Sequence, residues 1–263
     1  MTFSLIALGL LLIALATALG AWAFARGNTP FAVDAWWNNL LVDAAVPLAG
    51  PVSHAMNVIG GGWVGVLVVP LGGAGALIAV RRPWAAAFFL TAEAVSAALV
   101  QLLKHLFGRA RPTEILIMSD YGSYPSGHVA NAATIAVCAV VLFPRLVVAL
   151  VGAAWILLMA FSRTYLHAHW LSDTVGGALV GIGAALVVAA VFSVPLAREP
   201  RLVASRGTAR QQQASPELSP PGPAGPPVSK GPRHSLRAFA HGHRPLLLFP
   251  ELSKRHALGH PPG

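Results

Sequence analysis

Six long apolar runs organise the sequence, and their length constrains the fold more than any other feature. A hydrocarbon core of about 30 Å needs about 20 helical residues at 1.5 Å each, so each run is a candidate membrane-spanning helix. The runs cover residues 3–24, 58–80, 84–107, 129–143, 146–161 and 175–196. We predict an all-α protein, a bundle of six transmembrane helices over residues 1–196. Tilt or burial among neighbours can compensate for the two short runs.

The composition excludes a soluble domain of this size. Of the 263 residues, 56% are hydrophobic and 10% are charged, and the mean hydropathy is +0.66. The second run is rich in glycine, which allows close helix packing and irregular backbone. The single cysteine, Cys138, lies in an apolar run, so no disulfide framework or cysteine metal site is available.

The basic charge belongs mainly to the C-terminal segment. Ten of the 18 basic residues and three of the nine acids follow Leu196, so residues 197–263 carry a formal +7 and the apolar region only +2. That segment is rich in Pro, Gly, Ser and Gln, a composition that cannot bury enough apolar surface to fold. We predict a disordered cytoplasmic tail there, and the location of the charge argues against a nucleic-acid partner.

A first polar cluster follows the third apolar run. It reads Lys104-His105-Leu106-Phe107-Gly108-Arg109-Ala110-Arg111-Pro112. Lys104 and Arg111 lie close to two helical turns apart and therefore share a face. Such cations can bind an anion, or they can simply favour the helix dipole and reach the interface. This cluster alone leaves both interpretations open.

A second cluster, Pro125-Ser126-Gly127-His128, immediately precedes the fourth run. Ser126 is a good helix cap, Gly127 lets backbone approach a ligand, and free N–H groups at a helix start bind phosphate. His128 would point into the same place. An ordinary cap followed by an interfacial histidine explains the tetrapeptide equally well.

A third cluster leads into the sixth run and contains Ser162-Arg163, His169 and Asp173. On a helix, a spacing of four residues lets Asp173 accept a hydrogen bond from one ring nitrogen of His169 and leaves the other free to attack. The neighbouring His167 has Leu171 at the same spacing. We therefore predict that His169 is the reactive histidine.

Together the three clusters resemble the type 2 phosphatidic acid phosphatase superfamily, which also contains vanadium haloperoxidases and glucose-6-phosphatase. The pattern of that superfamily reads K-x6-R-P, then P-S-G-H, then S-R-x5-H-x3-D. Residues 104–112, 125–128 and 162–173 keep every fixed position and spacing. The six apolar runs also look like the lipid phosphatases of the superfamily, which extends the resemblance over about residues 1–196.

The resemblance implies that His169 attacks phosphorus to form a phosphohistidine, that Asp173 orients its ring and that His128 protonates the leaving oxygen. It also implies a phosphate-binding set of Lys104, Arg111, Ser126, Gly127 and Arg163. Phosphoryl transfer depends on positioned cations, and a covalent intermediate divides one hard displacement into two. We therefore expect a membrane phosphatase for a lipid phosphate or isoprenoid diphosphate, such as phosphatidic acid, phosphatidylglycerol phosphate or undecaprenyl diphosphate.

No metal or other cofactor is expected. Outside the tail the acids are Asp34, Asp43, Glu93, Glu114, Asp120 and Asp173, and no pair has an evident ligand spacing. Glu93 lies eleven residues before Lys104 on the same predicted helix face. An acid at that depth is either a functional partner or a paired structural residue.

Three other classes of protein are alternatives to this expectation. A vanadate-dependent peroxidase would use the same pocket, because vanadate resembles phosphate, but enzymes of that class are typically soluble. A non-catalytic membrane protein that binds lipid phosphate should lack a catalytic histidine, and none is lost. A phosphotransferase that moves phosphate to an alcohol would keep every motif, and only its products would distinguish it.

The basic residues also predict the orientation. With six helices, the side of the tail also holds Arg81, Arg82 and Arg145. The opposite side holds more cations in its short loops, but three of these belong to the predicted site. Once those three are set aside, the positive-inside rule places both termini in the cytoplasm and the site on the extracytoplasmic face of the cell membrane.

Overall fold

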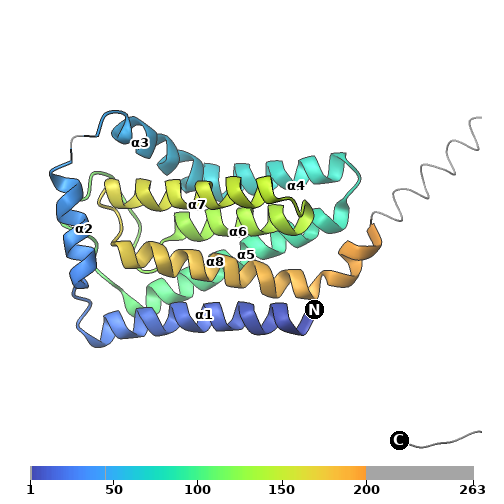
Figure 1. Cartoon of the computed structure of the whole chain (residues 1–263), viewed down its shortest axis with the longest axis horizontal. Coiled ribbons are helices and arrows are strands. Elements are labelled where there is room, and N and C mark those ends of the chain that lie inside the picture. The colour runs from blue at the N-terminus through green and yellow to red at the C-terminus, as the bar shows by residue number, and fades with distance from the viewer. Residues whose placement is uncertain (1, 45, 200–263) are drawn as a thin grey trace, which may run out of the picture. The chain divides into compact units, whose positions relative to one another are not determined.

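The computed structural model describes residues 2–44 and 46–199, and every regular element in those residues is helical (Figure 1). The all-α prediction is therefore confirmed. From residue 200 on, the predicted tail lies outside the described residues. In chain order the elements are α1 (Thr2–Ala25), α2 (Ala32–Val42), α3 (Ala49–Gly60), the π-helix η1 (Val64–Val68), α4 (Val69–Ala79), α5 (Pro83–Phe107), α6 (Gly127–Leu142), α7 (Leu146–Tyr165) and α8 (Leu171–Val191).

Four of these helices, α1, α5, α7 and α8, are long and apolar enough to cross a membrane. The segments α3 and η1–α4 reach that length only together, as one pair bent by 51°. The described residues therefore contain four spanning helices, or five with the bent pair, where the apolar runs predict six. The remaining run forms α6, which has only 16 residues and packs against α5, α7 and α8.

Helix α8 is the centre of the packing. It packs against α1, α5 and α6, and 61% of its most apolar window is buried. Small residues allow this approach. A Cβ atom added at Gly183 would lie 2.7 Å from the carbonyl oxygen of Gly9 on α1, closer than a side chain can come. The two backbones meet because neither position carries a side chain.

The bend between α3 and η1 is held from inside the bundle by Asn131 of α6. Its side-chain amide donates to the carbonyl oxygens of Gly60 (3.3 Å) and Gly65 (3.0 Å). Within the bend, Gly62 has a φ of 55°, a conformation that side chains disfavour. A side-chain donor can satisfy carbonyls that a helix break leaves free. The irregular backbone expected from the glycine-rich run is confirmed.

One end of the bundle gathers the polar segments. Helices α5 and α7 end there, α6 and α8 begin there, and α2 crosses that end (Figure 1). The three predicted clusters therefore meet at one end of the bundle. This is expected, because alternate connections between antiparallel helices lie at the same end. The start of α1 and the end of α8 lie at the opposite end (Figure 1).

At that opposite end, Glu199 caps α5. Helical backbone continues over residues 193–199. The Glu199 carboxylate accepts hydrogen bonds from the backbone N–H groups of Trp84 (2.6 Å) and Ala85 (3.3 Å), and it pairs with Arg82 at 3.3 Å. A carboxylate suits this position because the first N–H groups of a helix lack intrahelical partners.

Candidate active site

His169 lies on the short segment between α7 and α8. Helix α7 ends at Tyr165, and α8 begins at Leu171 after Trp170 in the N-cap position. His167 turns the chain with a φ of 50°. The turn leaves the His169 side chain buried but outside both helices.

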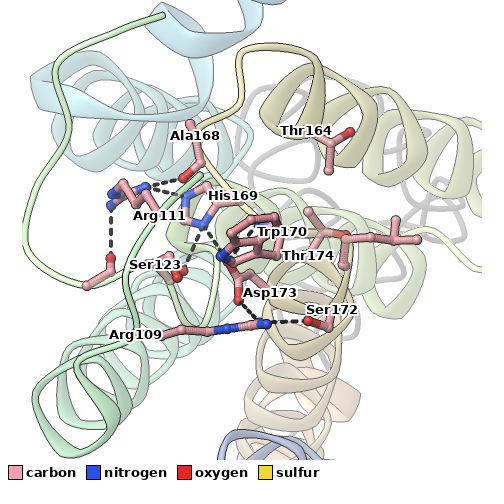
Figure 2. Close-up of polar contacts among 12 residues, drawn as sticks. Arg109, Arg111, Ser123, Thr164, Ala168, His169, Trp170, Ser172, Asp173 and Thr174 are labelled. Carbon is pink, nitrogen blue, oxygen red and sulfur yellow. Dashed lines mark hydrogen bonds and ion pairs between the residues drawn. The ribbon is translucent and has the colours of Figure 1, made fainter. Parts of the chain in front are cut away.

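Both ring nitrogens of His169 have partners (Figure 2). Nδ1 lies 2.7 Å from the carbonyl oxygen of Ser123, and Nε2 lies 3.2 Å from NH1 of Arg111. A carbonyl only accepts and a guanidinium only donates, so this network assigns the proton to Nδ1 and a lone pair to Nε2. Burial, followed by the nearby Arg163 and Arg111 cations, lowers the pKa of His169 well below its usual value. The ring is therefore neutral and nucleophilic at neutral pH.

Asp173 contacts His169 differently from the expected helical pair. Its Oδ2 lies 3.7 Å from Nδ1 of His169, beyond hydrogen-bond distance, and instead accepts from the backbone N–H of Trp170 at 2.9 Å. The prediction of a hydrogen bond to the ring is wrong because His169 precedes α8, so helical spacing does not apply. The carboxylate still lies close enough to stabilise positive charge on the ring (Figure 2).

Arg109, to which the motifs assign no role, bridges two acids beneath His169. It donates through NH1 to Asp173 (2.7 Å) and to the hydroxyl of Ser172 (2.7 Å), and through NH2 to Asp34 of α2 (2.8 Å). Asp34 also accepts from the backbone N–H and the hydroxyl of Ser172. The side chains in both ion pairs are 0% exposed. These four residues, named the Arg109 cluster below, fasten α2 and α8 to the site.

Three cations from different elements surround His169. Lys104 comes from the last turn of α5, Arg111 from the following loop and Arg163 from the last turn of α7. Arg163 donates through NH1 to the side-chain oxygen of Asn57, whereas its buried Nε has no partner within residues 2–44 and 46–199. We refer to Lys104, Arg111 and Arg163 as the cradle.

The start of α6 lies beside the cradle. Ser126 occupies the N-cap position, as the sequence predicts, but its hydroxyl makes no capping bond and is buried with no partner in the described part of the chain. Its backbone N–H donates to the carbonyl oxygen of Asp173 at 2.9 Å, which ties the start of α6 to α8. Gly127 follows in the first turn. Ser126 and Arg163 thus each offer an unused donor.

Asn57, at the end of α3, is a site residue that the motifs miss. Its backbone carbonyl oxygen lies 3.1 Å from Nε2 of His128, and its side chain holds Arg163. A few residues further on, a Cβ added at Gly61 would lie 2.2 Å from Nε2 of His128. The bent second run therefore shapes the site, and its consecutive glycines were the only sequence signal.

A cavity of about 840 Å³ joins these groups to the interior of the bundle. Of the eight predicted site residues, five line it: Lys104, Gly127, His128, Arg163 and His169. Arg111, Ser126 and Asp173 are not lining residues, although Arg111 contacts His169, which is one. The cavity continues between η1–α4 and α5 as far as Glu93, about 16 Å along α5 from Lys104. Apolar residues such as Leu71 and Leu90 line that extension.

His167 faces away from the cavity. Its Nδ1 lies 2.8 Å from the side-chain oxygen of Asn38 on α2. The preference for His169 over His167 agrees with this geometry. Within the described ranges, no three His, Cys, Asp or Glu side chains group as metal ligands.

The fold and the site define an α-helical, multi-pass membrane protein in which a buried neutral histidine faces a cationic pocket. Residues 85–195 match the family model described as the PAP2 superfamily, and all three motifs fall in that segment. The resemblance inferred from the motifs is therefore confirmed over residues 85–195, the segment that matches this family model.

Curated relatives carry similar sequences. The chain is 31% identical over 125 residues to lipid A 1-phosphatases of Rhizobium etli and Rhizobium johnstonii. The alignments cover 42% of this chain and 51% and 49% of those proteins, so the chain spans about half the length of the curated relatives it matches.

Two solved structures share the fold. One is a transmembrane PAP2 type phosphatidylglycerolphosphate phosphatase from Bacillus subtilis, with a TM-score of 0.59 and 22% identity over 68% of this chain and 93% of that chain. The other is LpxE from Aquifex aeolicus, with a TM-score of 0.53 and 26% identity over 60% and 95% of the two chains. The bundle is therefore shared beyond the segment that the family model matches.

Proposed function

We propose that this protein is a membrane phosphatase that removes a terminal phosphate from a lipid through a phosphohistidine at His169. One observation carries the proposal: the unprotonated Nε2 of His169 faces Arg111 at 3.2 Å and opens into a cavity shared with Lys104, Arg163 and His128. A neutral nucleophile among fixed cations is what phosphoryl transfer requires. The phosphatase names of similar proteins support the same activity.

In the first step, the cradle holds the phosphate oxygens and neutralises the charge of the transition state. The unused donors of Arg163 and Ser126, with the backbone N–H of Gly127, complete the proposed binding set. Nε2 of His169 forms a bond to phosphorus while the bond from phosphorus to the lipid oxygen breaks. The bound phosphate anion favours the doubly protonated ring of His128, which lines the same cavity and donates a proton to that oxygen.

In the second step, water attacks phosphorus, the bond from phosphorus to Nε2 breaks and inorganic phosphate leaves. His128 takes a proton from the attacking water, in the reverse of its first role. The ring of His169 carries positive charge in the intermediate. The Ser123 carbonyl at 2.7 Å and the Asp173 carboxylate at 3.7 Å stabilise that charge.

The apolar extension of the cavity supports a lipid substrate, because a hydrocarbon chain can occupy it while the phosphate lies in the cradle. The proposed candidates are phosphatidic acid, phosphatidylglycerol phosphate, undecaprenyl diphosphate and, from the Rhizobium relatives, the 1-phosphate of lipid A. We further propose that the site faces the extracytoplasmic side of the cell membrane, with the start of α1 and the end of α8 at the cytoplasmic side. Their shared position opposite the site agrees with both ends lying on one side of the membrane (Figure 1), and the positive-inside rule favours the cytoplasm for that side.

The test is phosphate release from each of these four lipids by the purified full chain in detergent, with EDTA present. His169→Ala should lower release by about 10⁴-fold. His167→Ala is the matched control, because its ring binds Asn38 outside the cavity. A base-stable, acid-labile phosphoryl label should be trapped on the wild type and on His167→Ala only.

Each other result has a definite meaning. Release that survives in His169→Ala rules out this histidine as the nucleophile. A folded wild type that releases phosphate from none of the lipids, yet binds phosphate, is a binding protein and not a phosphatase of these substrates.

A further inference from the structure

The cradle is occupied by an acid that belongs to no motif. Asp120, in the loop before α6, places Oδ2 3.0 Å from Nζ of Lys104 and Oδ1 2.7 Å from NH2 of Arg111. It lines the cavity together with His169, and its side chain is 60% exposed. Asp120 therefore engages two of the three cations that would hold a phosphate.

The carboxylate lies where phosphoryl oxygens would bind. Arg111 holds Oδ1 of Asp120 through NH2 and contacts Nε2 of His169 through NH1 at 3.2 Å. A phosphate within reach of Nε2 and bound by Arg111 and Lys104 would have to replace the carboxylate, because the two anions would repel each other at contact distance.

The cations remain in position when the Asp120 side chain leaves. The carbonyl oxygen of Gly122 accepts from Nζ of Lys104 and from NH2 of Arg111, each at 2.9 Å. Gly122 has a φ of 68°, in the region that favours glycine, and this conformation turns its carbonyl towards both cations. Displacing Asp120 therefore needs rotation of one exposed side chain and no rebuilding of the site.

The exchange favours one class of anion. A terminal phosphate carries about −1.5 to −2 charges at pH 7 and three free oxygens, which exceeds the single charge of a carboxylate. A phosphodiester carries one charge and two free oxygens, so it offers the cations no more than Asp120 already does. Phosphodiester headgroups form most of the surface of a phospholipid bilayer and would fill an unguarded cationic site.

We propose that Asp120 is a specificity-determining residue that reserves the cradle for terminal phosphates and excludes the phosphodiester headgroups of the surrounding bilayer. This inference rests on the phosphatase function proposed above and adds the basis of its selectivity. By competing for Lys104 and Arg111, Asp120 also promotes the release of inorganic phosphate after hydrolysis.

The test compares the full wild-type chain with Asp120→Asn and with Glu114→Gln as a matched control. Glu114 lies in the same loop, but its carboxylate accepts from Asn38 of α2. Binding of inorganic phosphate is measured from the rise in unfolding temperature in detergent, which requires no turnover. Selectivity is measured as inhibition of phosphatidic acid hydrolysis by increasing mole fractions of phosphatidylglycerol, a phosphodiester.

We expect Asp120→Asn to bind phosphate roughly three- to tenfold more tightly than the other two proteins, on the scale of one or two partly exposed ion pairs. Phosphatidylglycerol should inhibit this variant alone. Equal or weaker phosphate binding would overturn the proposal, because removing a residue that merely anchors the loop would leave phosphate binding unchanged or weaken it. Tighter phosphate binding without inhibition by phosphatidylglycerol would overturn the proposed selectivity against phosphodiesters.

Arg111→Ala separates this inference from the proposed function. If Arg111→Ala loses phosphate binding while Asp120→Asn behaves as the wild type, the cradle binds phosphate and Asp120 does not guard it. If Arg111→Ala binds phosphate as the wild type does, the cradle is not the phosphate site and the proposed function fails as well.

Discussion

Two ion-pair networks meet at His169, and they differ in how readily their acids can leave. In the Arg109 cluster the side chains of Arg109, Asp34 and Asp173 are 0% exposed. At the cradle the side chain of Asp120 is 60% exposed. Separating a buried pair leaves charge without compensation, whereas water can solvate an exposed acid that leaves its partner. We therefore interpret the first network as a fixed scaffold and the second as the exchangeable binding site proposed above.

The largest effect is expected from breaking the scaffold. Arg109→Ala leaves Asp34 and Asp173 buried and unpaired, and it should lower the free energy of unfolding by about 3–5 kcal/mol. Thermal unfolding in detergent measures the change, with Arg26→Ala as the control because Arg26 is an exposed cation of the same end. Equal stability of the two variants would show that the Arg109 cluster is not a scaffold.

Removing a cation from the cradle should impair chemistry and leave stability nearly intact. Arg111→Ala should reduce the rate of phosphate release by about 10²–10³-fold, the usual effect of losing one positioned donor. Arg111→Lys should recover little, because lysine cannot contact His169 and Asp120 through separate nitrogens. The rate and the unfolding temperature are measured on the same samples. A loss of stability as large as that of Arg109→Ala would remove the distinction between the networks.

The exchangeable site should also respond to pH. Partial burial alone would raise the pKa of Asp120, but Lys104 and Arg111 hold it below its usual value, so the acid stays ionised from pH 5 to pH 8. As the pH falls below neutral, inorganic phosphate takes up a proton, loses its second charge and becomes the weaker competitor. Wild-type affinity for phosphate should therefore fall about tenfold from pH 7.5 to pH 5.

Asp120→Asn should show a smaller fall, because no carboxylate competes. Both proteins keep the histidines of the cavity, so the difference between their pH profiles isolates Asp120. Titration of phosphate binding by thermal shift at each pH provides the measurement, and identical profiles would argue that Asp120 is a fixed part of the site.

The smallest effect is expected from a shift of His128, the proposed proton donor, while the cradle stays intact. A Cβ at Gly61 would lie 2.2 Å from Nε2 of His128, so Gly61→Ala must displace that ring. We expect phosphate release to fall by about fivefold while phosphate binding stays unchanged. Gly72→Ala is the control, because a Cβ there meets open space. Weaker phosphate binding in Gly61→Ala would mean that the bend supports the cradle itself.

Hydropathy predicts where most helices lie but not how they begin or bend. The run 84–107 matches α5 within one residue. In contrast, α8 begins at Leu171 and not at the predicted residue 175, because its polar first turn is buried in the Arg109 cluster. Hydropathy predicts one helix over residues 58–80, because glycines do not lower the mean hydropathy enough to divide the run. Only the structure shows the bend there and its brace, Asn131.

The motifs identify the side chains of the site more fully than their partners. Lys104, Arg163, His128 and His169 do line one cavity. The acceptor of the His169 proton is instead a backbone carbonyl, at Ser123, and a carbonyl has no sequence signature. The motifs also miss Asp34 and Asp120. Asp34 pairs with Arg109, which lies 75 positions away, and Asp120 pairs with Arg111 across an irregular loop, so neither pair has a recognisable spacing in the sequence.

The cap that Glu199 provides for α5 has a consequence for the order of assembly. Its acceptor oxygen meets donors that lie 115 and 114 positions earlier in the chain. During synthesis the first turn of α5 exists with free N–H groups until three further helices have been made, and contacts of such sequence separation form late. The cap can therefore form only after all the helices of the bundle have been made. A chain cut at residue 196, where the apolar sequence ends, would hold every motif and still lack the contact that closes it.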